Sequence, residues 1–499
     1  MTSQPAFLRA AGRPAQPPVS PYAIAAIVAA VLAMGLGIAT AWVPSLIFLS
    51  VGTAALLIVL LPPALGRGFD LFSPWSFLAL SVLLGLTVRG VYITLGYPDF
   101  ETLDSLYFLG EYPTFFARPA VILLLGLLIV AISYMSGRAR RARRHVLRHW
   151  NTQKLYLLAC LALAVSLAGT FLYVKQTGGF ESDVLSAKRT KMSHVDISDE
   201  AYGAKGTLMA FSSLAMFAHV LVLADLLRST GAGRSWKLLL ALALFLAACI
   251  VPFYGSDRSS IALNACMSAG MLYYSGRSFP LMRIVSISCA IVVAIHVMTV
   301  LRGIRDQTDV MENLSITPDL IASAVVNRNY IGLGKTSQII AAVPETLELQ
   351  YGKTIMVWLV VAVPRELWRD KPLIQSGPIV GDLVYGTNRS GVPPGYIAEL
   401  YWNFQLPGVI IGCAIFGWLM RYLFERFRPV RGGDLFMTTI YVCGPMQFGF
   451  NVLGHSLGSG VFHLLLNMAV MSGFLWMIRD RRRIRPGCKV VPRLARVHP

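Results

Sequence analysis

The amino-acid sequence predicts an all-α, polytopic membrane protein. Of the 499 residues, 55% are hydrophobic and 14% are charged, whereas about a quarter of the residues in soluble domains are charged. The mean hydropathy is correspondingly high, at +0.61. The apolar residues also form repeated runs of about 20, the length that a helix needs to cross the hydrocarbon of a bilayer. Composition and run length together exclude an ordinary soluble domain.

The run-length rule predicts twelve transmembrane helices. Nine of them precede one long polar loop, and three follow it. We expect these helices at about residues 22–41, 45–65, 74–95, 115–136, 155–174, 204–227, 237–255, 259–275, 282–301, 406–425, 434–452 and 459–478.

The spans divide the chain into five regions. Residues 1–20 are rich in Pro, Ala and Gln and are predicted to be a disordered cytoplasmic tail. The first nine spans form a transmembrane bundle over residues 21–301. A large periplasmic loop with short interfacial helices occupies 302–404, and the last three spans occupy 405–478. Residues 479–499 form a basic cytoplasmic tail.

The basic residues orient the bundle. The segment after the fourth span reads GRARRARRHVLRHW (137–150), and the last span is followed by RDRRRIRPGCKVVPRLAR (479–496). Loops rich in Lys and Arg stay in the cytoplasm, so both termini are expected there and the acidic loop at 96–114 is expected outside. This asymmetry accounts for the net charge of +19. We therefore expect membrane lipid, and no nucleic acid, as a partner.

The seven cysteines indicate neither disulfides nor a metal centre. None has CxxC spacing, and none falls in an expected external loop, so we predict no metal and no cofactor. Six of them lie within apolar spans, where thiols act as small apolar fillers. The seventh is Cys488, in the basic tail.

The large loop contains a cluster of cations between prolines, in PRELWRDKPLIQSGPIVG (364–381). Arg365, Arg369 and Lys371 lie in this run, and Arg302 and Arg305 open the same loop. Cations on an otherwise acidic external surface suggest an anionic ligand at the membrane.

Other interpretations of these cations remain open. The PRELWRDKP run is also consistent with a solvated turn, in which Glu366 and Asp370 pair with the arginines at four-residue spacing. A position after the C-terminus of a helix favours cations such as Arg302 and Arg305 in any case. The apolar run at 352–363 is too short to span and suits a re-entrant or interfacial helix.

The hairpin YGSDRSS (254–260) suggests a second anion-binding element. Ser256 or Asp257 can cap the eighth helix, which places Arg258 in its first turn. The helix dipole disfavours a cation there, and a bound anion would reverse that penalty. A snorkelling arginine paired with Asp257 explains the same pattern equally well.

The segment GVPPGYIAELYWNFQLPG (391–408) leads into the tenth span. Tyr396, Tyr401 and Trp402 predict an aromatic belt that could stack on sugar rings. Glu399 lies among them, where desolvation would raise its pKa and suit it to act as a general base. An interfacial carboxylate bound to a neighbouring arginine is the alternative.

Two further polar positions stand out. His455, just before the last span, is a second possible base, although a lone histidine is more often structural. Asp225, near the cytoplasmic end of the sixth span, is costly in lipid, and we expect it to pair with Arg228.

These motifs resemble the bacterial oligosaccharide repeat-unit polymerases, the Wzy-type polymerases of O-antigen, capsule and exopolysaccharide. The resemblance lies in PRELWRDKP, SGPIVGDLVYG, PPGYIAELYWNF and a Gly-rich last external span. The specific match covers about Met356 to Gly412, and SDRS, with Asp257 and Arg258, is a weaker match. The multi-span architecture and the large late loop agree over most of the chain.

The resemblance implies a membrane glycosyltransferase of the metal-independent, lipid-donor type. Its substrates would be a polyprenyl-diphosphate-linked glycan donor and acceptor, joined at the periplasmic face of the inner membrane. A chain-length regulator and a flippase would be partners. The implied diphosphate-binding residues are Arg258, Arg302, Arg305, Arg365, Arg369 and Lys371, with Glu399 as the first and His455 as the second candidate for the catalytic base.

Other functions stay open at this point. An O-antigen ligase would use similar arginines, and a lipid-linked glycan flippase or other transporter would suit twelve spans. Transporters usually have internal repeats, and we find no convincing repeat in the sequence. A structural or assembly subunit without chemistry is a third class.

Overall fold

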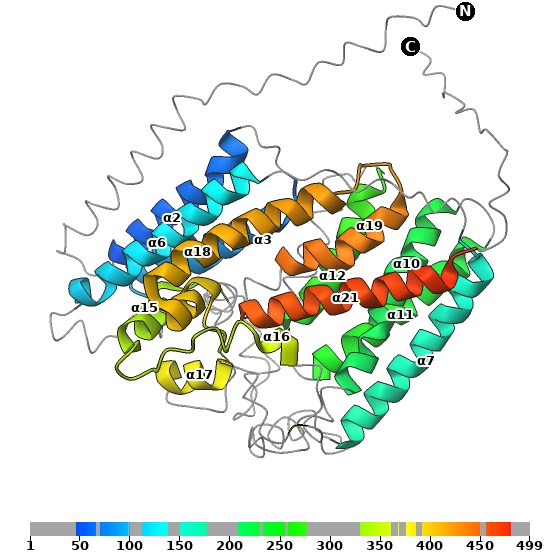
Figure 1. Ribbon diagram of the computed structural model, residues 1–499. Helices are drawn as coiled ribbons and strands as arrows, with labels where there is room; N and C mark the ends of the chain where they lie inside the picture. The colour runs from blue at the N-terminus through cyan, green and yellow to red at the C-terminus, as the bar shows by residue number, and fades with distance from the viewer. Residues whose placement is uncertain are drawn as a thin grey trace, which may run out of the picture.

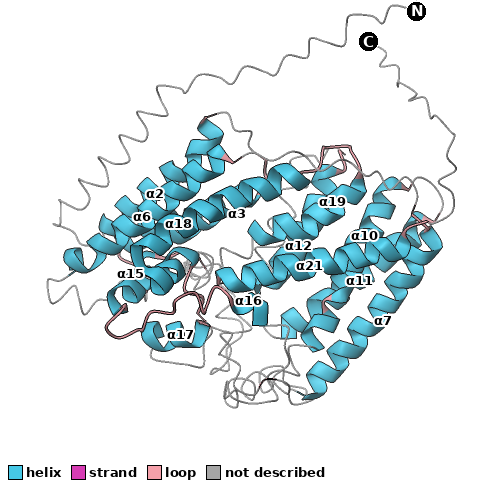
Figure 2. Ribbon diagram, viewed as in Figure 1, coloured by secondary structure: helices cyan, strands magenta, loops and turns pink. Residues whose placement is uncertain are grey.

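The computed structural model describes residues 46–65, 70–97, 99, 112–137, 150–176, 208–229, 233–254, 258–276, 330–360, 368, 376–385, 392–449 and 456–480. Within these ranges the regular elements are all helices, apart from one isolated backbone bridge between Trp150 and Arg479 (Figure 2). The elements are α2 (Leu46–Ala64), α3 (Pro74–Val82), η2 (Leu83–Val88), α4 (Arg89–Thr94), α6 (Tyr112–Ser136), α7 (Thr152–Gln176), α10 (Leu214–Arg228), α11 (Arg234–Tyr254), α12 (Arg258–Tyr274), α15 (Leu333–Ala342), α16 (Val357–Val360), α17 (Gly377–Tyr385), α18 (Tyr396–Phe427), α19 (Leu435–Tyr441), η4 (Val442–Met446) and α21 (Leu457–Ile478).

Eight helices in the described part are long and apolar enough to cross a membrane, so the chain is a polytopic membrane protein. Each of the eight coincides with one of the twelve predicted spans, within a few residues at most ends. They run over Leu46–Ala64, Pro74–Thr94, Thr114–Ser136, Thr152–Lys175, Leu208–Arg228, Arg234–Phe253, Tyr396–Phe427 and Leu457–Ile478.

The other four predicted spans have different outcomes. The span expected at 259–275 is helix α12, whose 17 residues are slightly short of the usual crossing length. The span expected at 434–452 is α19 continued by the π-helix η4. Pro445 lies inside η4 and lacks the N–H that a regular α-helical ladder needs. The spans expected at 22–41 and 282–301 lie outside the described residues.

The helices pack as two groups, which are visible side by side in Figure 1. The first group is built from α2, α3 with η2, α6, α15 and most of α18 around one apolar core. The second is built from α7, α10, α11, α12, α19 with η4, and much of α21. Within the first group, α18 packs against α6 along much of its length.

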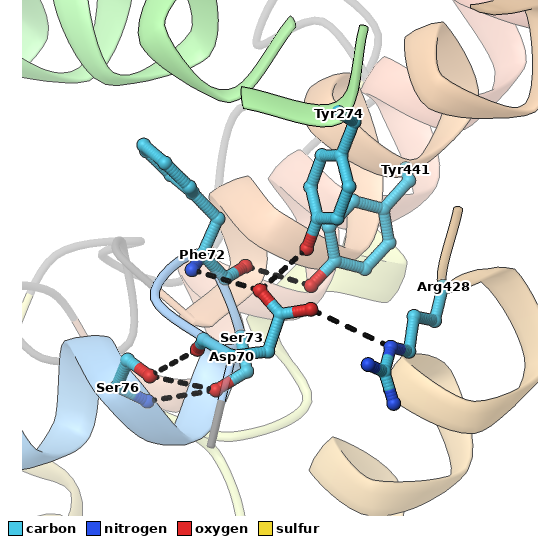
Figure 3. Close-up of polar contacts among 7 residues, drawn as sticks. All are labelled: Asp70, Phe72, Ser73, Ser76, Tyr274, Arg428 and Tyr441. Carbon is cyan, nitrogen blue, oxygen red and sulfur yellow. Dashed lines mark hydrogen bonds and ion pairs between the residues drawn. The ribbon is translucent and has the colours of Figure 1, made fainter. Parts of the chain in front are cut away.

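Polar contacts join the two groups at one end of the bundle, which we call the tail end because Ile478 lies there. Asp70, 4% exposed, precedes α3 and accepts hydrogen bonds from the Tyr274 hydroxyl at 2.7 Å and from the Phe72 backbone nitrogen at 3.2 Å. Arg428 approaches its second oxygen at 3.4 Å, and Tyr441 donates to the Phe72 carbonyl oxygen at 2.7 Å (Figure 3). The cluster therefore connects α3, α12, α18 and α19.

A second polar cluster at the tail end corrects one sequence prediction. Asp225 does not pair with Arg228. Its carboxylate binds Lys237 of α11 at 2.8 Å and accepts a 2.5 Å hydrogen bond from the Tyr156 hydroxyl of α7. Arg228 instead lies over the Trp150 ring, 5.1 Å from its centroid. Asp225 thus links three helices rather than stabilising one locally.

At the opposite end, which we call the loop end, residues from the large loop pack into the helices. The segment 330–360 carries α15, which contacts α6, α17 and α18. Its start lies against the π-helix η2, where a side chain on Gly85 would overlap the Ile331 carbonyl oxygen. One turn further on, the buried Arg89 binds Asp99 through bonds of 2.8 and 2.7 Å. The described part of the loop at 330–360 therefore belongs to the bundle.

Candidate functional site

Helix α18 contains a sharp break between two helical arms. A straight helix of its 32 residues would be about 48 Å long at 1.5 Å per residue, more than the roughly 30 Å of bilayer hydrocarbon. Phe404 and Gln405 have non-helical backbone angles, and Gln405 has a φ of 52°, the left-handed region that non-glycine residues rarely adopt. The break leaves a short arm, 396–403, and a long arm, 407–427.

The two arms pack antiparallel as a hairpin. The Tyr396 ring, at the start of the short arm, lies 4.8 Å from the Phe416 ring, well along the long arm. Leu400 packs on Gly408 and Gly412: a Cβ on Gly408 would lie 2.5 Å from the Leu400 carbonyl oxygen. Small residues allow this approach of two helix backbones. The short arm is thus re-entrant, with every residue from Tyr396 to Asn403 buried.

Asn403 ties the tip of the hairpin to the large loop. Its side-chain oxygen accepts from the Gly352 backbone nitrogen at 2.8 Å, and its side-chain nitrogen donates to the Thr354 hydroxyl at 2.7 Å. Trp402 donates from its indole nitrogen to the Glu348 carbonyl oxygen at 3.0 Å. The segment 348–354 is therefore fastened across the hairpin tip.

These contacts also alter the expectation for residues 352–363. The sequence predicted a re-entrant or interfacial helix there; Gly352 has a φ of 89° and forms a turn, and residues 361–363 lie outside the described residues. The helix α16 starts only at Val357. Within the described part of the loop, the arm at 396–403 folds back against the rest of α18.

Glu399 is fully buried on the side of the short arm that faces α21. Its Oε2 accepts a 2.6 Å hydrogen bond from the Leu457 backbone nitrogen, at the first residue of α21. The N-terminus of a helix carries a partial positive charge that favours a carboxylate. Its Oε1 makes no well-formed hydrogen bond in the described part of the chain, where Thr354 is the side chain that interacts with this carboxyl group. Glu399 thus fastens the short arm to α21, whose first half packs on the first core and whose second half packs on the second.

The other face of the short arm borders a hollow of about 480 Å³ next to α6. Arg118 of α6 donates a 2.6 Å hydrogen bond to the Tyr401 hydroxyl at this hollow. The remaining lining is mostly apolar and consists of Ala117, Val121, Ile122, Leu125, Gln405 and Leu406. Val121 and Leu406 are more than 40% exposed, so the hollow opens toward the surface that a membrane would cover.

The predicted aromatic residues do not form an open platform. Tyr396, Tyr401 and Trp402 are 1–2% exposed, and their rings pack within the protein. Only Tyr401 borders the hollow. Access of a sugar ring to the other two would require movement of their neighbours.

The predicted cations fall mainly beyond the described side chains. Arg258 is the first residue of α12, which confirms its expected place in the first helical turn, but its side chain lies outside the description. The remaining predicted ligands lie outside the described residues: Arg302, Arg305, Arg365, Arg369, Lys371 and the second base, His455.

Arg118 is a site residue that was not predicted from the sequence. The sequence did contain a signal for it, because a charged side chain within an apolar span costs free energy in the membrane and often marks a functional site. The signal is weak because Arg118 lies near one end of the predicted span at 115–136, where the side chain of an arginine can reach the membrane interface.

In the described ranges, no three His, Cys, Asp or Glu side chains gather closely enough to hold a metal ion. Comparisons with protein-family models, curated proteins and solved structures found no match.

Proposed function

We propose that the protein is a polysaccharide polymerase, a metal-independent glycosyltransferase of a bacterial inner membrane. It would join polyprenyl-diphosphate-linked repeat units at the periplasmic face, with both termini in the cytoplasm. The observation that supports this most is the placement of PPGYIAELYWNF, the segment that resembles the polymerases. It is built into the membrane bundle as the buried arm of a hairpin, with a carboxyl group on one face and Arg118 beside the other.

The proposed reaction couples two lipid-linked glycans. A hydroxyl oxygen at the non-reducing end of the acceptor forms a bond to the anomeric carbon of the donor glycan. The bond from that carbon to the diphosphate oxygen breaks, and its electron pair leaves with the polyprenyl diphosphate. The hydroxyl proton passes to a base. Cations facing the diphosphate stabilise its growing negative charge, and the proposed set is Arg258, Arg302, Arg305, Arg365, Arg369 and Lys371.

Glu399 is our first proposal for the base. The Leu457 N–H fixes Oε2, which leaves Oε1 to accept the proton. Because Glu399 is fully buried, an acceptor can reach it only after the 348–356 segment or the N-terminus of α21 moves aside. His455, two residues before the first residue of α21, is the second proposal for the base. A flippase that supplies the substrates and a chain-length regulator are the proposed partners.

The broken helix also favours one competing function. Transporters commonly build their substrate sites from discontinuous helices, and the arms of α18 form such an element. A lipid-linked glycan flippase is therefore the second candidate. An O-antigen ligase, which would use the same kind of site, differs from a polymerase only in its acceptor.

Two measurements separate these functions. A deletion strain should accumulate glycan capped with single repeat units if the protein is a polymerase, whereas normal-length polymer that stays unattached indicates a ligase. Purified protein should elongate lipid-linked repeat units in detergent, where no gradient exists, and a flippase would give no product. Glu399→Gln should abolish elongation in both assays while the protein remains folded. Full activity of that variant would reject Glu399 as the base.

A further inference from the structure

The hollow between α6 and the hairpin has the composition of a site for an anionic lipid. Its lining residues are apolar except for Arg118, Tyr401 and Gln405, and the Arg118 guanidinium donates to the Tyr401 hydroxyl. A soluble anion gains little from apolar walls. A lipid with a phosphate head would satisfy both parts, with its hydrocarbon on the apolar residues and its head on the cation.

Arg118 has donors to spare for such a head group. A guanidinium carries five N–H donors, and the Tyr401 hydroxyl accepts one of them. No carboxylate among the described residues forms an ion pair with Arg118. The Tyr401 hydroxyl accepts from Arg118 and keeps its own proton to donate. Both groups can therefore bind one phosphate together.

The break in α18 adds to the positive potential. Gln405 and Leu406 line the hollow and directly precede the long arm, which begins at about Pro407. The N-terminus of that arm carries a partial positive charge. Arg118 of α6 and the N-terminus of the long arm of α18 thus both contribute positive potential to the hollow.

The position of the hollow relative to Glu399 indicates which of the two lipid substrates, the donor or the acceptor, it binds. Glu399 and Tyr401 are two residues apart, about 200° around a helix of 3.6 residues per turn. Glu399 accordingly contacts α21, whereas Tyr401 contacts α6. A phosphate bound at Arg118 is separated from the Glu399 carboxyl by the thickness of the short arm. The donor's diphosphate must touch the reacting carbon, but the acceptor's diphosphate lies a whole repeat unit away from its reacting hydroxyl.

We infer that this hollow binds the diphosphate head of the acceptor lipid, with Arg118 and Tyr401 as its ligands. The choice of acceptor rests on the polymerase function proposed above. The loop cations would then serve the donor. The opening of the hollow toward exposed apolar residues gives a lipid direct lateral entry.

The test is a titration of the full-length protein, in nanodiscs of phosphatidylcholine, with a long-chain polyprenyl phosphate. Arg118→Ala should weaken binding about tenfold or more, the effect of losing a charge-assisted contact. Lys175→Ala is the matched control, because it removes an exposed cation from the loop end of α7, away from the hollow. It should bind as the wild type does. If Arg118→Ala does not fold, Arg118→Gln takes its place.

Three parallel probes identify the ligand. Polyprenol, which lacks the phosphate, should bind weakly and equally to the wild type and Arg118→Ala. Inorganic phosphate should not displace the lipid, and phosphatidylglycerol should compete poorly. Unchanged affinity in the Arg118 variants, displacement by free phosphate, or equal binding of phosphatidylglycerol would each overturn the proposed site.

Kinetics separate this inference from the proposed function. With purified donor and acceptor, Arg118→Ala should raise the KM for the acceptor about tenfold and leave the KM for the donor unchanged. If the wild type elongates glycans but Arg118→Ala has a normal acceptor KM, the acceptor site is wrong and the polymerase function stands. If the wild type binds the lipid through Arg118 but transfers no glycan, the polymerase function and the acceptor assignment fail together.

Discussion

The carboxylate of Glu399 lies 2.6 Å from the backbone nitrogen of Leu457, so the short arm of α18 holds the N-terminus of α21, a helix that packs on both cores. Asp70 and Tyr274 make the corresponding junction at the tail end, at 2.7 Å. Each end of the bundle thus has a junction between helices that a buried carboxylate makes.

Glu399 should have separable structural and chemical roles. Glu399→Gln keeps an oxygen that can accept from Leu457, so we expect a loss of only about 1 kcal/mol in unfolding free energy. Glu399→Ala leaves the Leu457 N–H without its acceptor and should cost about 1.5–3 kcal/mol, the range for hydrogen bonds to charged groups. Thermal unfolding in detergent measures both. Equal losses for the two variants would contradict the anchoring role.

At the tail end, Tyr274 should matter more than Arg428. The Tyr274 hydroxyl binds a carboxylate that is almost fully buried, so Tyr274→Phe should destabilise the protein by about 1.5–3 kcal/mol. Arg428 is 38% exposed and lies 3.4 Å from Asp70, and Arg428→Ala should cost less than about 1 kcal/mol. A double-mutant cycle with Asp70→Asn should give coupling for Tyr274 and little for Arg428. The reverse order would refute this view of the cluster.

The helical hairpin should depend on Gly408 more than on Gly412. A methyl group at Gly408 meets the Leu400 backbone oxygen, which cannot move without shifting the arm, whereas one at Gly412 meets only the flexible Leu400 side chain. We expect Gly408→Ala to cost at least about 2 kcal/mol and Gly412→Ala less, as for overpacked cores.

Gly473 supplies the control for the hairpin glycines. It lies in the middle of α21 with no atom within 4 Å of an added Cβ. Gly473→Ala should therefore be neutral or stabilising by up to about 1 kcal/mol, because alanine is the better helix former. Equal destabilisation by Gly408→Ala and Gly473→Ala would argue against the close packing of the two arms.

Lys237, rather than Arg228, should be the partner that stabilises Asp225. Lys237→Ala leaves a buried carboxylate without its cation and should destabilise the protein by about 3–5 kcal/mol. Arg228→Ala removes only a cation–π contact with Trp150, worth about 0.5–1 kcal/mol. Unfolding of the two variants in detergent compares them directly, and a larger loss for Arg228→Ala would restore the pairing expected from the sequence.

Eight of the twelve predicted spans are confirmed in the described residues, because the length of an apolar run is a local property. The predicted tenth span began at 406, one residue beyond Gln405, where the helical geometry of α18 is broken. The folding back of residues 396–403 could not be predicted from the sequence. An apolar segment that packs against its own span has the same composition as one that lengthens the span. Likewise, Asp225 lies three residues before Arg228 in sequence, and nothing local indicated that Lys237 approaches it from the next helix.

The candidate site was predicted only in part. Glu399 and Tyr401 were chosen for their residue types, but their opposite directions depend on packing against α21 and α6. The partner of Glu399 is a backbone nitrogen 58 positions away, and a backbone donor has no sequence signature. Arg118 precedes Tyr401 by 283 positions in the sequence, so the contact between them could not be inferred without the fold.

The hairpin has a consequence for biogenesis. The short arm carries Glu399 and Asn403, polar groups that are costly in lipid until they find partners. The partner of Glu399 is Leu457, at the start of α21, so that partner has not been synthesised when the arm leaves the ribosome. The long arm can insert at once, whereas the short arm can take its final place only after α21 has entered the membrane. The buried arm that carries Glu399 is therefore among the last parts of the molecule to assemble, and a chain that stops before α21 cannot complete it.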